Sequence, residues 1–318
     1  MSRVVVASRS FSRHPVLRAE LLSRFPDATF NDQGLSLAGE ALIEFLSGHD
    51  KAVIALEKID GTVLDALPDL KVIAKYGVGF DKLDLHALIE RGIALGWTGG
   101  VNRRSVAELV IAFAISMLRL IPQGHANVKS GGWQQLIGRQ LSDCTVGIIG
   151  CGHVGKELGR MLRAGFGCTV LANDIADDRD FYAEHGIRAT DLETLLTSSD
   201  VVSLHLPLDP STENLLNAER LSSMKPGAVL INTARGGLVD EAKLKSLLEA
   251  GALGGAAFDV FAVEPPRDTA LLELPNFLVT PHIGGSAEEA IVAMGRAAIE
   301  GLDNYKIPEP GVFPPGRW

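Results

Sequence analysis

Residues 146–155 read Val146-Gly147-Ile148-Ile149-Gly150-Cys151-Gly152-His153-Val154-Gly155, and they carry the strongest structural signal in the chain. An apolar, β-branched run leads directly into a G-x-G-x-x-G loop, and a helical pattern follows the loop. In such a segment Gly150 makes the tight turn, Gly152 lets the backbone approach a pyrophosphate, and Gly155 lets helix and strand pack closely. The segment therefore predicts a dinucleotide-binding loop, whose phosphate-facing residues are Gly150, Gly152, His153, Val154 and Gly155.

This loop opens an alternating block of strand and helix patterns that runs to about Gly284. Apolar runs predict six strands, and helical stretches separate them. The predicted strands are Thr145–Ile149, Thr169–Ala172, Val201–Leu204, Val229–Asn232, Gly255–Phe258 and Leu278–Thr280. Six strands in this order fit a dinucleotide-binding fold with a parallel sheet.

An acid at the end of the second predicted strand bears on which dinucleotide binds. Asp174 follows the glycine loop by about twenty residues, where a carboxylate hydrogen-bonds the hydroxyls of the adenine ribose. Its negative charge repels a 2′-phosphate, and no arginine follows it directly, so we expect NAD rather than NADP. Arg179 lies a few residues later and keeps NADP as an alternative.

The first hundred residues show a second alternation of strands and helices. Amphipathic stretches such as Pro15–Phe25 and Leu37–Leu46 predict helices between short β-branched runs. The predicted strands are Val4–Ala7, Ala52–Leu56, Val72–Ala74 and Gly92–Gly96. This alternation predicts another parallel, doubly wound sheet. After Ser286 the pattern predicts one long Ala-rich helix, which we expect to cross back to this first domain and make it discontinuous.

The bulk composition restricts the class of protein. The chain has 318 residues, 46% hydrophobic and 22% charged, with a net charge of −9, which is typical of a globular protein of two domains. No Lys/Arg cluster is large enough for a nucleic-acid partner. Three cysteines without a CxxC pair predict neither disulfides nor a metal site. The N-terminal run has a strand pattern, and the longest apolar run, 106–121, is too short to span a bilayer, so we expect a cytoplasmic protein without membrane contact.

Three titratable or charged residues follow buried strands of the second block. Arg235 comes after the strand that ends at Asn232, Glu264 after the strand that ends at Phe258, and His282 after the last strand. Glycines or prolines flank each of them and fix the local backbone. Because ligands bind at the carboxyl ends of strands in such sheets, these three residues are the candidate catalytic groups.

The segments around these residues resemble the D-isomer-specific 2-hydroxyacid dehydrogenases. The resemblance rests on Asn232-Thr233-Ala234-Arg235-Gly236-Gly237-Leu238-Val239-Asp240, on Phe258-Asp259-Val260-Phe261 with Glu264-Pro265-Pro266, and on Thr280-Pro281-His282-Ile283-Gly284-Gly285. It extends to 76–81, to Asn102 with 105–108, and to 205–208, so it covers nearly the whole chain. Long motifs in the right order make it very specific.

The resemblance implies a role for each candidate catalytic residue. Arg235 would pair with the substrate carboxylate and polarise the C2 oxygen. His282 would give a proton to the keto oxygen during reduction, or take it from the alcohol during oxidation. Glu264 would contact the imidazole, orient it and favour its charged form. The implied reaction is hydride transfer between NAD(H) and a D-2-hydroxy acid or its 2-keto acid.

The same resemblance implies binding residues. The backbone of Val78 and Gly79 would cradle the substrate carboxylate, next to Arg235 and His282. Asp259 would hold the nicotinamide carboxamide, and Thr233 would lie along the nicotinamide. The other implied cofactor contacts are His205, Pro207, Thr212, Ala234, Arg235, His282 and Gly284. For His205 a structural role is favoured over a catalytic one, because the proton-transfer role is already filled.

The predicted fold is therefore α/β, with two domains. A Rossmann NAD-binding domain over 101–285 would carry a dimerisation helix. A flavodoxin-like substrate domain would be discontinuous, over 1–100 and 286–318. The family forms its dimer around the apolar helix 106–118 and the following Gly131-Gly132-Trp133 region, so the resemblance implies a homodimer whose ligand is a small 2-hydroxy or 2-keto acid.

The identity of the acid stays open, including whether it is phosphorylated like 3-phosphoglycerate. Lys58, Lys75 and Arg103 or Arg104 are candidate anion anchors, whereas Glu57 would repel a phosphate. Trp97-Thr98-Gly99-Gly100 replaces the family's more usual Asn-Thr-Pro-Gly, so Trp97 either narrows the substrate pocket or packs.

Other functions are compatible with parts of the pattern. A phosphite-type dehydrogenase keeps the same Arg–Glu–His set. Formate dehydrogenases have Gln where Glu264 stands, and the acid argues against them. An NAD(H)-sensing corepressor or scaffold on the same fold can also retain the triad, because fold and function are only loosely tied.

Overall fold

The computed structural model describes residues 2–314. Within them the chain forms two compact units. The first unit comprises the chain up to Asn102 together with the chain from Ala287, and the second unit is Arg103–Ser286. The predicted substrate domain includes residues 1 and 315–318, which lie outside the described part. The division of cofactor and substrate binding between two domains stays a prediction.

The second unit is built on one parallel sheet of seven strands, in the order β12-β11-β10-β9-β6-β7-β8. Its strands are β6 (Thr145–Ile149), β7 (Thr169–Asn173), β8 (Arg188–Ala189), β9 (Val201–Leu204), β10 (Val229–Asn232), β11 (Gly255–Phe258) and β12 (Phe277–Val279). The order reverses between β6 and β9, as in dinucleotide-binding folds. The prediction of six strands was wrong by one: β8 has two exposed residues and therefore leaves no hydrophobic pattern in the sequence.

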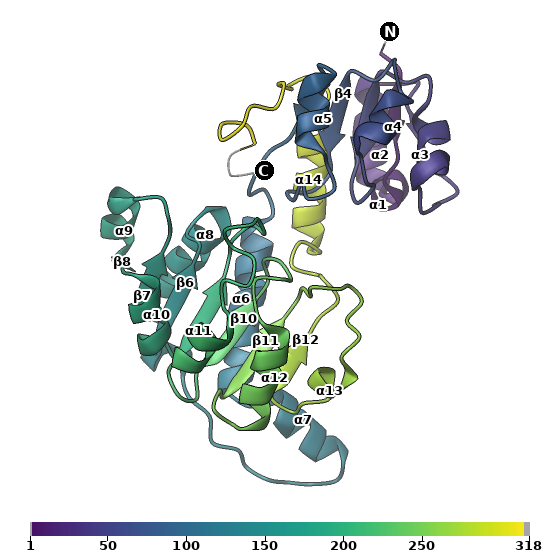
Figure 1. Ribbon diagram of the computed structural model, residues 1–318. Helices are drawn as coiled ribbons and strands as arrows, with labels where there is room; N and C mark the ends of the chain where they lie inside the picture. Colours follow the sequence, from purple (N-terminus) through teal and green to yellow (C-terminus); the bar gives the residue numbers. More distant parts are fainter. Residues whose placement is uncertain (1, 315–318) are drawn as a thin grey trace. The chain divides into compact units, whose positions relative to one another are not determined.

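Helices cover both faces of this sheet (Figure 1). They are α6 (Arg103–Leu118), α8 (His153–Met161), α9 (Arg179–His185), α10 (Leu192–Ser198), α11 (Ala218–Ser223), α12 (Glu241–Glu249) and α13 (Thr269–Leu272). The remaining helix, α7 (Ile121–Lys129), follows α6 and has no buried residue. Strand residues alternate between two cores: Ile148 points toward α6 and α8, and its neighbour Ile149 points toward α10 and α11. Burial on both faces explains why these strands are continuous apolar runs.

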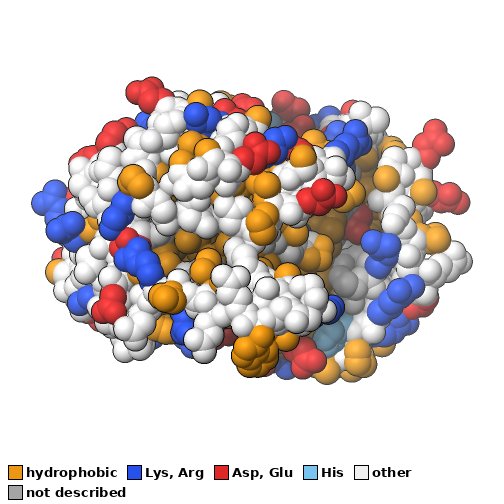
Figure 2. Space-filling view, turned by 90° about the horizontal axis from the view of Figure 1, so that it is seen from below, with side chains coloured by type: hydrophobic (Ala, Val, Ile, Leu, Met, Phe, Trp, Pro, Cys, Tyr) orange, Lys and Arg blue, Asp and Glu red, His pale blue; other side chains and the backbone are white. Residues whose placement is uncertain are grey.

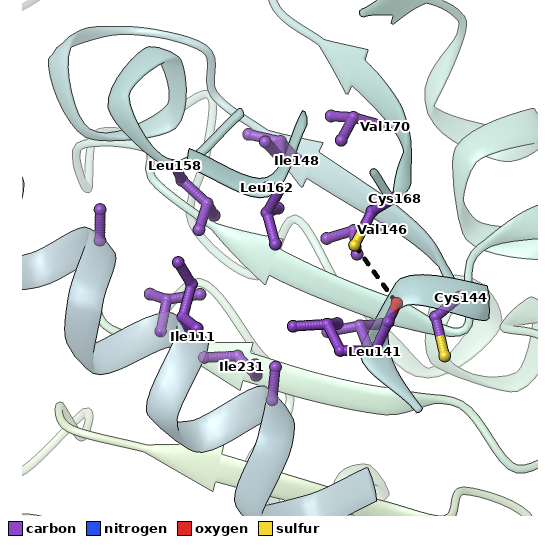
Figure 3. Packing of buried hydrophobic residues seen from close by; sticks show 14 of the residues in the cluster. Ile111, Leu141, Cys144, Val146, Ile148, Leu158, Leu162, Cys168, Val170 and Ile231 are labelled. Atoms are coloured by element: carbon purple, nitrogen blue, oxygen red, sulfur yellow. Dashed lines mark hydrogen bonds between the residues drawn. The ribbon is translucent and has the colours of Figure 1, made fainter. Parts of the chain in front are cut away.

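The core on the α6 side is shown in Figure 3, where Ile111 of α6 and Leu158 of α8 point toward Ile148 and Ile231 of the sheet. The Sγ atom of Cys168 donates to the carbonyl of Leu141, 3.2 Å away, in the same cluster. The apolar helix predicted over 106–118 is part of α6, and α6 packs on α8, β10 and β11. The apolar side chains on several faces of α6 therefore contribute to the core of the second unit.

The first unit has a parallel five-stranded sheet in the order β2-β1-β3-β4-β5, which is the flavodoxin-like order. Its strands are β1 (Val4–Val6), β2 (Thr29–Phe30), β3 (Lys51–Ile54), β4 (Val72–Lys75) and β5 (Ala94–Gly96). Its helices are α1 (Arg9–Arg13), α2 (Pro15–Arg24), α3 (Gly39–Leu46), α4 (Gly61–Asp65), α5 (Leu85–Glu90) and α14 (Glu288–Gly301). No strand was predicted for β2, because two residues are too few for a hydrophobic pattern.

The helix from the far end of the chain, α14, completes one face of this first sheet. Ala298, Ile299 and Leu302 pack in a core with β1, β3 and β4. Gly96 and Gly301 meet backbone to backbone: a Cβ on Gly96 would lie 2.0 Å from the carbonyl oxygen of Gly301. Because only glycine allows two backbones to approach so closely, β5 and the end of α14 can pack together only with glycine at these positions.

No single helix of the described residues is long and apolar enough to cross a membrane; α6 and α7 meet the length and composition requirement only as a pair bent by 61°. Figure 2 shows one face of the molecule, on which Lys and Arg side chains lie among Asp and Glu side chains.

Candidate active site

The loops that carry the predicted catalytic residues leave the same edge of the seven-stranded sheet. Thr233–Gly237 follows β10, Phe261–Glu264 follows β11, and Thr280–Gly284 follows β12. The glycine loop follows β6 at the same edge, because all seven strands are parallel. The second unit thus collects the three predicted catalytic residues and the predicted phosphate loop on one side.

His282 and Glu264 are in direct contact. The Nδ1 atom of His282 lies 2.9 Å from Oε2 of Glu264, and the side chains are 52% and 41% exposed. The other oxygen of Glu264 accepts a hydrogen bond from the Phe261 amide at 3.2 Å. One carboxylate therefore bridges the ring and the β11 loop, and it fixes Nδ1 as the side of the ring that faces protein. The Nε2 side is left for a ligand.

The backbone of His282 is held in an uncommon conformation. Its φ is +54°, in the left-handed region, and its amide donates to the carbonyl of Asp259 at 3.0 Å. The Asp259 side chain, 1% exposed, accepts hydrogen bonds from the Thr280 hydroxyl at 2.5 Å and from the amides of Ile283 and Gly284, both at 2.7 Å. Buried structure of this kind can impose a strained backbone.

Asp259 therefore organises the loop that presents His282. Sequence reasoning gave Asp259 only a contact with the nicotinamide carboxamide. A carboxylate has about four acceptor positions, and three are in use, so one remains for that predicted contact. Ser105, at the start of α6, adds a hydrogen bond of 2.7 Å to the carbonyl of Gly284. The hydrogen bonds of Asp259 and Ser105 could not be predicted from the sequence, because each joins segments far apart along the chain.

The Arg235 loop is shaped by Asn232, which sequence reasoning missed. The buried Asn232 side chain donates to the carbonyl of Arg235 at 2.8 Å and accepts from the Ala234 amide at 3.1 Å. A Cβ on Gly236 would lie 1.9 Å from the backbone of Phe261, so the loops after β10 and β11 pack against each other. An asparagine directly after a strand is the available signal, since its side chain favours such turns. Arg235 donates to the Ala234 carbonyl at 2.7 Å.

The glycine loop has the geometry that a dinucleotide phosphate needs. Gly150 has φ of +89°, and a Cβ on Gly155 would lie 2.2 Å from the Gly150 carbonyl oxygen. A Cβ on Gly152 would meet nothing within 4 Å, so open space lies at the N-terminus of α8. Asp174 accepts hydrogen bonds from the amides of Cys151 at 2.5 Å and Ala176 at 2.8 Å.

Two histidines near this loop have lowered pKa values, which favour the neutral form of each ring. Partial burial, with the positive charges of Arg103 and Lys156, lowers the pKa of His153. Burial lowers the pKa of His205 to about 3. The His205 ring lies 2.9 Å from the Ser203 hydroxyl and is neutral at neutral pH. Burial also raises the pKa of the Cys151 thiol to about 11, so this cysteine is not a thiolate near neutral pH.

The remaining predicted cofactor contacts lie on the same edge. The hydroxyl of Thr212 donates to the Pro207 carbonyl at 2.7 Å and closes the loop after β9. Among the described residues, the buried Oγ1 of Thr233 has no hydrogen-bond partner. An unsatisfied hydroxyl beside Arg235, together with the open glycine loop and Asp174, fits a site that is completed by a dinucleotide.

The predicted substrate-binding residues Val78 and Gly79 follow β4 in the first unit. The indole nitrogen of Trp97 donates to the Val78 carbonyl at 2.9 Å. The Trp97 ring also packs edge-on against Phe80 and Phe313, with centroids 5.8 and 6.1 Å apart. Trp97 thus packs against the loop and fixes one of its carbonyl groups.

The candidate anion anchors already interact with other groups of the protein. Lys58 pairs with Asp60 at 3.0 Å. Lys75 is 5% exposed and donates to the carbonyls of Ala55 at 2.6 Å and Tyr76 at 3.3 Å. In the second unit, Arg104 pairs with Glu108 at 2.6 Å and with Glu157 at 3.1 Å. Arg103 also has an interaction partner.

This fold and this set of residues define a dinucleotide-dependent oxidoreductase, and comparison with known proteins gives its family. Residues 111–284 match the model of the D-isomer specific 2-hydroxyacid dehydrogenase, NAD binding domain. The chain belongs to the D-isomer-specific 2-hydroxyacid dehydrogenases, which are NAD-dependent oxidoreductases.

Individual relatives differ in how much of their length is matched. A D-3-phosphoglycerate dehydrogenase of Archaeoglobus fulgidus is 37% identical over 84% of this chain and 51% of its own, so the chain spans about half of that relative. A glycerate dehydrogenase of Methylorubrum extorquens is 37% identical over 85% of this chain and 87% of its own. The crystal structure of a D-lactate dehydrogenase from Aquifex aeolicus, complexed with NAD and lactic acid, has a TM-score of 0.81 and 27% identity, covering 94% of this chain and 93% of that one.

Proposed function

We propose that the protein transfers hydride between NAD(H) and C2 of a D-2-hydroxy acid or the corresponding 2-keto acid, with Arg235, Glu264 and His282 as its catalytic residues. The observation that carries the proposal is the 2.9 Å contact between His282 and Glu264 on a strained loop. The contact lies at the carboxyl edge of the sheet, where the family's cofactor binds. A proton donor oriented by an acid is what reduction of a keto group requires.

Each side chain has a defined part in the proposed reaction. Glu264 holds Nδ1 of His282, so Nε2 is the atom that donates a proton to the keto oxygen. The carboxylate compensates the positive charge on the ring while it carries that proton. Arg235 pairs with the substrate carboxylate through its planar fork and polarises the C2 oxygen. When bound, the nicotinamide supplies or accepts the hydride.

The proposed cofactor site uses mainly backbone groups. The amides at the start of α8 would hold the pyrophosphate, with Gly152 giving access and Arg103 and Lys156 adding positive charge. Asp174 would bind the adenine ribose and disfavour NADP. The free Thr233 hydroxyl would gain a partner on the nicotinamide side.

The substrate is proposed to be an unphosphorylated acid. The chain is similar to a D-3-phosphoglycerate dehydrogenase and to a glycerate dehydrogenase, so relatives alone allow either kind. In this protein Lys58 is paired with Asp60, and Arg104 is paired with two glutamates. A phosphate dianion would have to compete with those ion pairs. The Val78–Gly79 backbone would bind the carboxylate at C1.

We further propose a homodimer. Four large hydrophobic side chains of α7 and the following loop are exposed: Ile121 at 50%, Val128 at 52%, Trp133 at 87% and Ile137 at 95%. A cluster of exposed apolar side chains marks an association surface more often than it marks free surface. The resemblance places the family's dimer contact in the same region.

NADH oxidation with a panel of 2-keto acids tests the proposal, and His282→Ala identifies the proton donor. We expect turnover of the variant to fall by about a hundredfold or more while NADH affinity, measured by fluorescence titration, stays within about threefold. His185→Ala removes a histidine from α9 and serves as the matched control. Unchanged turnover in His282→Ala would remove His282 from the mechanism, and an inactive wild type that still binds NADH would favour the sensor or scaffold.

A further inference from the structure

A cavity lies in the first unit, and none of the catalytic or cofactor residues named above lines it. Its volume is about 470 Å³, within the range of about 300–1,000 Å³ that is typical of small-molecule sites. It opens among the loops that follow β1 and β3 and the segment after β2. We call it the Arg9–Arg13 pocket, after the two arginines that line it together with Ser10, Leu37, Ala55 and Glu57.

The two arginines are available to a ligand. Within residues 2–314, neither guanidinium takes part in a hydrogen bond or an ion pair. By contrast, Arg18 and Arg24 of the adjacent α2 are paired with acids. The carboxylate of Glu57 accepts the amide of Ala55 at 2.6 Å. Two arginines against one glutamate leave the pocket with one net positive charge and with unused donors that suit a carboxylate.

The pocket adjoins the loop proposed to bind the C1 carboxylate. The carbonyl of Ala55, a pocket residue, accepts from Nζ of the buried Lys75 at 2.6 Å. That same Nζ lies 3.3 Å from the position of a Cβ on Gly77, directly before Val78 and Gly79. β3 and β4 are neighbours in a parallel sheet, so their carboxyl ends lie side by side. Lys75 thus connects the pocket wall with the substrate loop.

We infer that the Arg9–Arg13 pocket receives a second carboxylate at the far end of the substrate, so that the protein acts on 2-keto acids with two carboxylates. This inference rests on the proposed function and narrows its substrate class. Leucines beside the arginines suit a short aliphatic arm between the two acid groups. One net positive charge matches a carboxylate monoanion better than a phosphate dianion.

The test compares substrates that differ only in the distal group. NADH oxidation is measured with 2-oxoglutarate and with 2-oxopentanoate, which has the same chain without the second carboxylate. We expect wild-type kcat/KM to favour 2-oxoglutarate by about tenfold or more, and the Arg9→Gln/Arg13→Gln variant to lose about tenfold or more of that ratio. Lys71→Gln removes one charge from the opposite end of the first sheet and is expected to keep the wild-type ratio. Equal ratios in wild type and the double variant would overturn the inference.

Two further measurements separate the remaining outcomes. If 3-phosphohydroxypyruvate is preferred and depends on the same arginines, the distal group is a phosphate and the carboxylate assignment is wrong. If no 2-keto acid oxidises NADH, the proposed function fails, and calorimetry with glutarate still tests the pocket. Glutarate binding that weakens about tenfold or more in the double variant would support the carboxylate site. Absent or unaffected binding would overturn it.

Discussion

The two edges of the seven-stranded sheet are built in opposite ways. At the amino edge, directly before β9, the Asp200 side chain is 5% exposed and is paired with two cations. It accepts from Arg139 at 2.8 Å, from Lys225 at 2.7 Å and from the Thr145 amide at 2.9 Å. At the carboxyl edge, the Glu264–His282 pair is about half exposed, and His282 has a strained backbone.

This difference separates stability from function within one sheet. A buried charge network helps to fix the fold, and its burial keeps the carboxylate away from a ligand. Exposed pairs contribute little to stability, and their free atoms can act on a substrate. Substitutions at the carboxyl edge should therefore change activity more than stability, and substitutions at the amino edge should do the reverse.

Among the substitutions that compare the two edges, the largest effect is expected from Glu264→Gln. The amide keeps an acceptor for Phe261 but removes the negative charge beside His282, so kcat for 2-keto acid reduction should fall by about a hundredfold. The free energy of unfolding should change by less than about 0.5 kcal/mol, because the side chain is partly exposed and the amide still accepts from Phe261. Steady-state kinetics and urea unfolding measure the two quantities. A large loss of stability with little loss of kcat would contradict the conclusion that the carboxyl edge serves activity more than stability.

Asp200→Asn tests the opposite edge. Burial alone would raise the pKa of the Asp200 carboxyl, but hydrogen bonds from Arg139, Lys225 and Thr145 outweigh it and lower the pKa to about 2. The variant should lose about 2 kcal/mol of unfolding free energy at pH 7, with kcat nearly unchanged.

The pH dependence of this effect has a definite sign. A carboxyl whose pKa is lowered in the folded state stabilises the protein above its unfolded pKa near 4, and that contribution is lost as the pH falls toward about 2. Urea unfolding at pH 7, 4 and 3 should therefore show the gap between wild type and Asp200→Asn narrowing at the lowest pH. Asp177→Asn, at an exposed ion pair, is the control and should show no such gap. A gap that widens in acid would refute the stabilising role of Asp200.

The smallest effect is expected from Asp174→Asn. Loss of the charge should weaken NADH binding by about fivefold to tenfold and reduce the preference over NADPH, because the repulsion of a 2′-phosphate disappears. The melting temperature should be nearly unchanged. Fluorescence titrations with both cofactors measure the effect, with Asp180→Asn as a nearby acidic control. An unaltered preference would assign cofactor choice to another group.

The sequence predicted what depends on local pattern. Residues 146–155 predicted the strand, the turn and the helix start together, because each glycine is needed by the backbone at that point. β9, β10 and β11 begin and end at the predicted residues, since strands buried on both faces are continuous apolar runs bounded by turns.

What could not be predicted depends on partners distant in sequence. Asp259 and Ser105 form their hydrogen bonds to the His282 loop only when β11, β12 and α6 are packed together. The close approach of Gly236 to Phe261 likewise requires that β10 and β11 lie side by side. The two-residue strands β2 and β8 are defined by their neighbours and carry no periodicity of their own. The Arg9–Arg13 pocket joins loops that the first sheet brings together.

The return of α14 to the first sheet has a consequence for synthesis on the ribosome. Residues up to Asn102 emerge first, yet one face of their sheet stays only partly covered until Ala298, Ile299 and Leu302 have been made. At about 5–20 residues per second, the roughly 200 intervening residues take about 10–40 s. The second unit can fold in that interval, so the part of the chain that is made first is completed last.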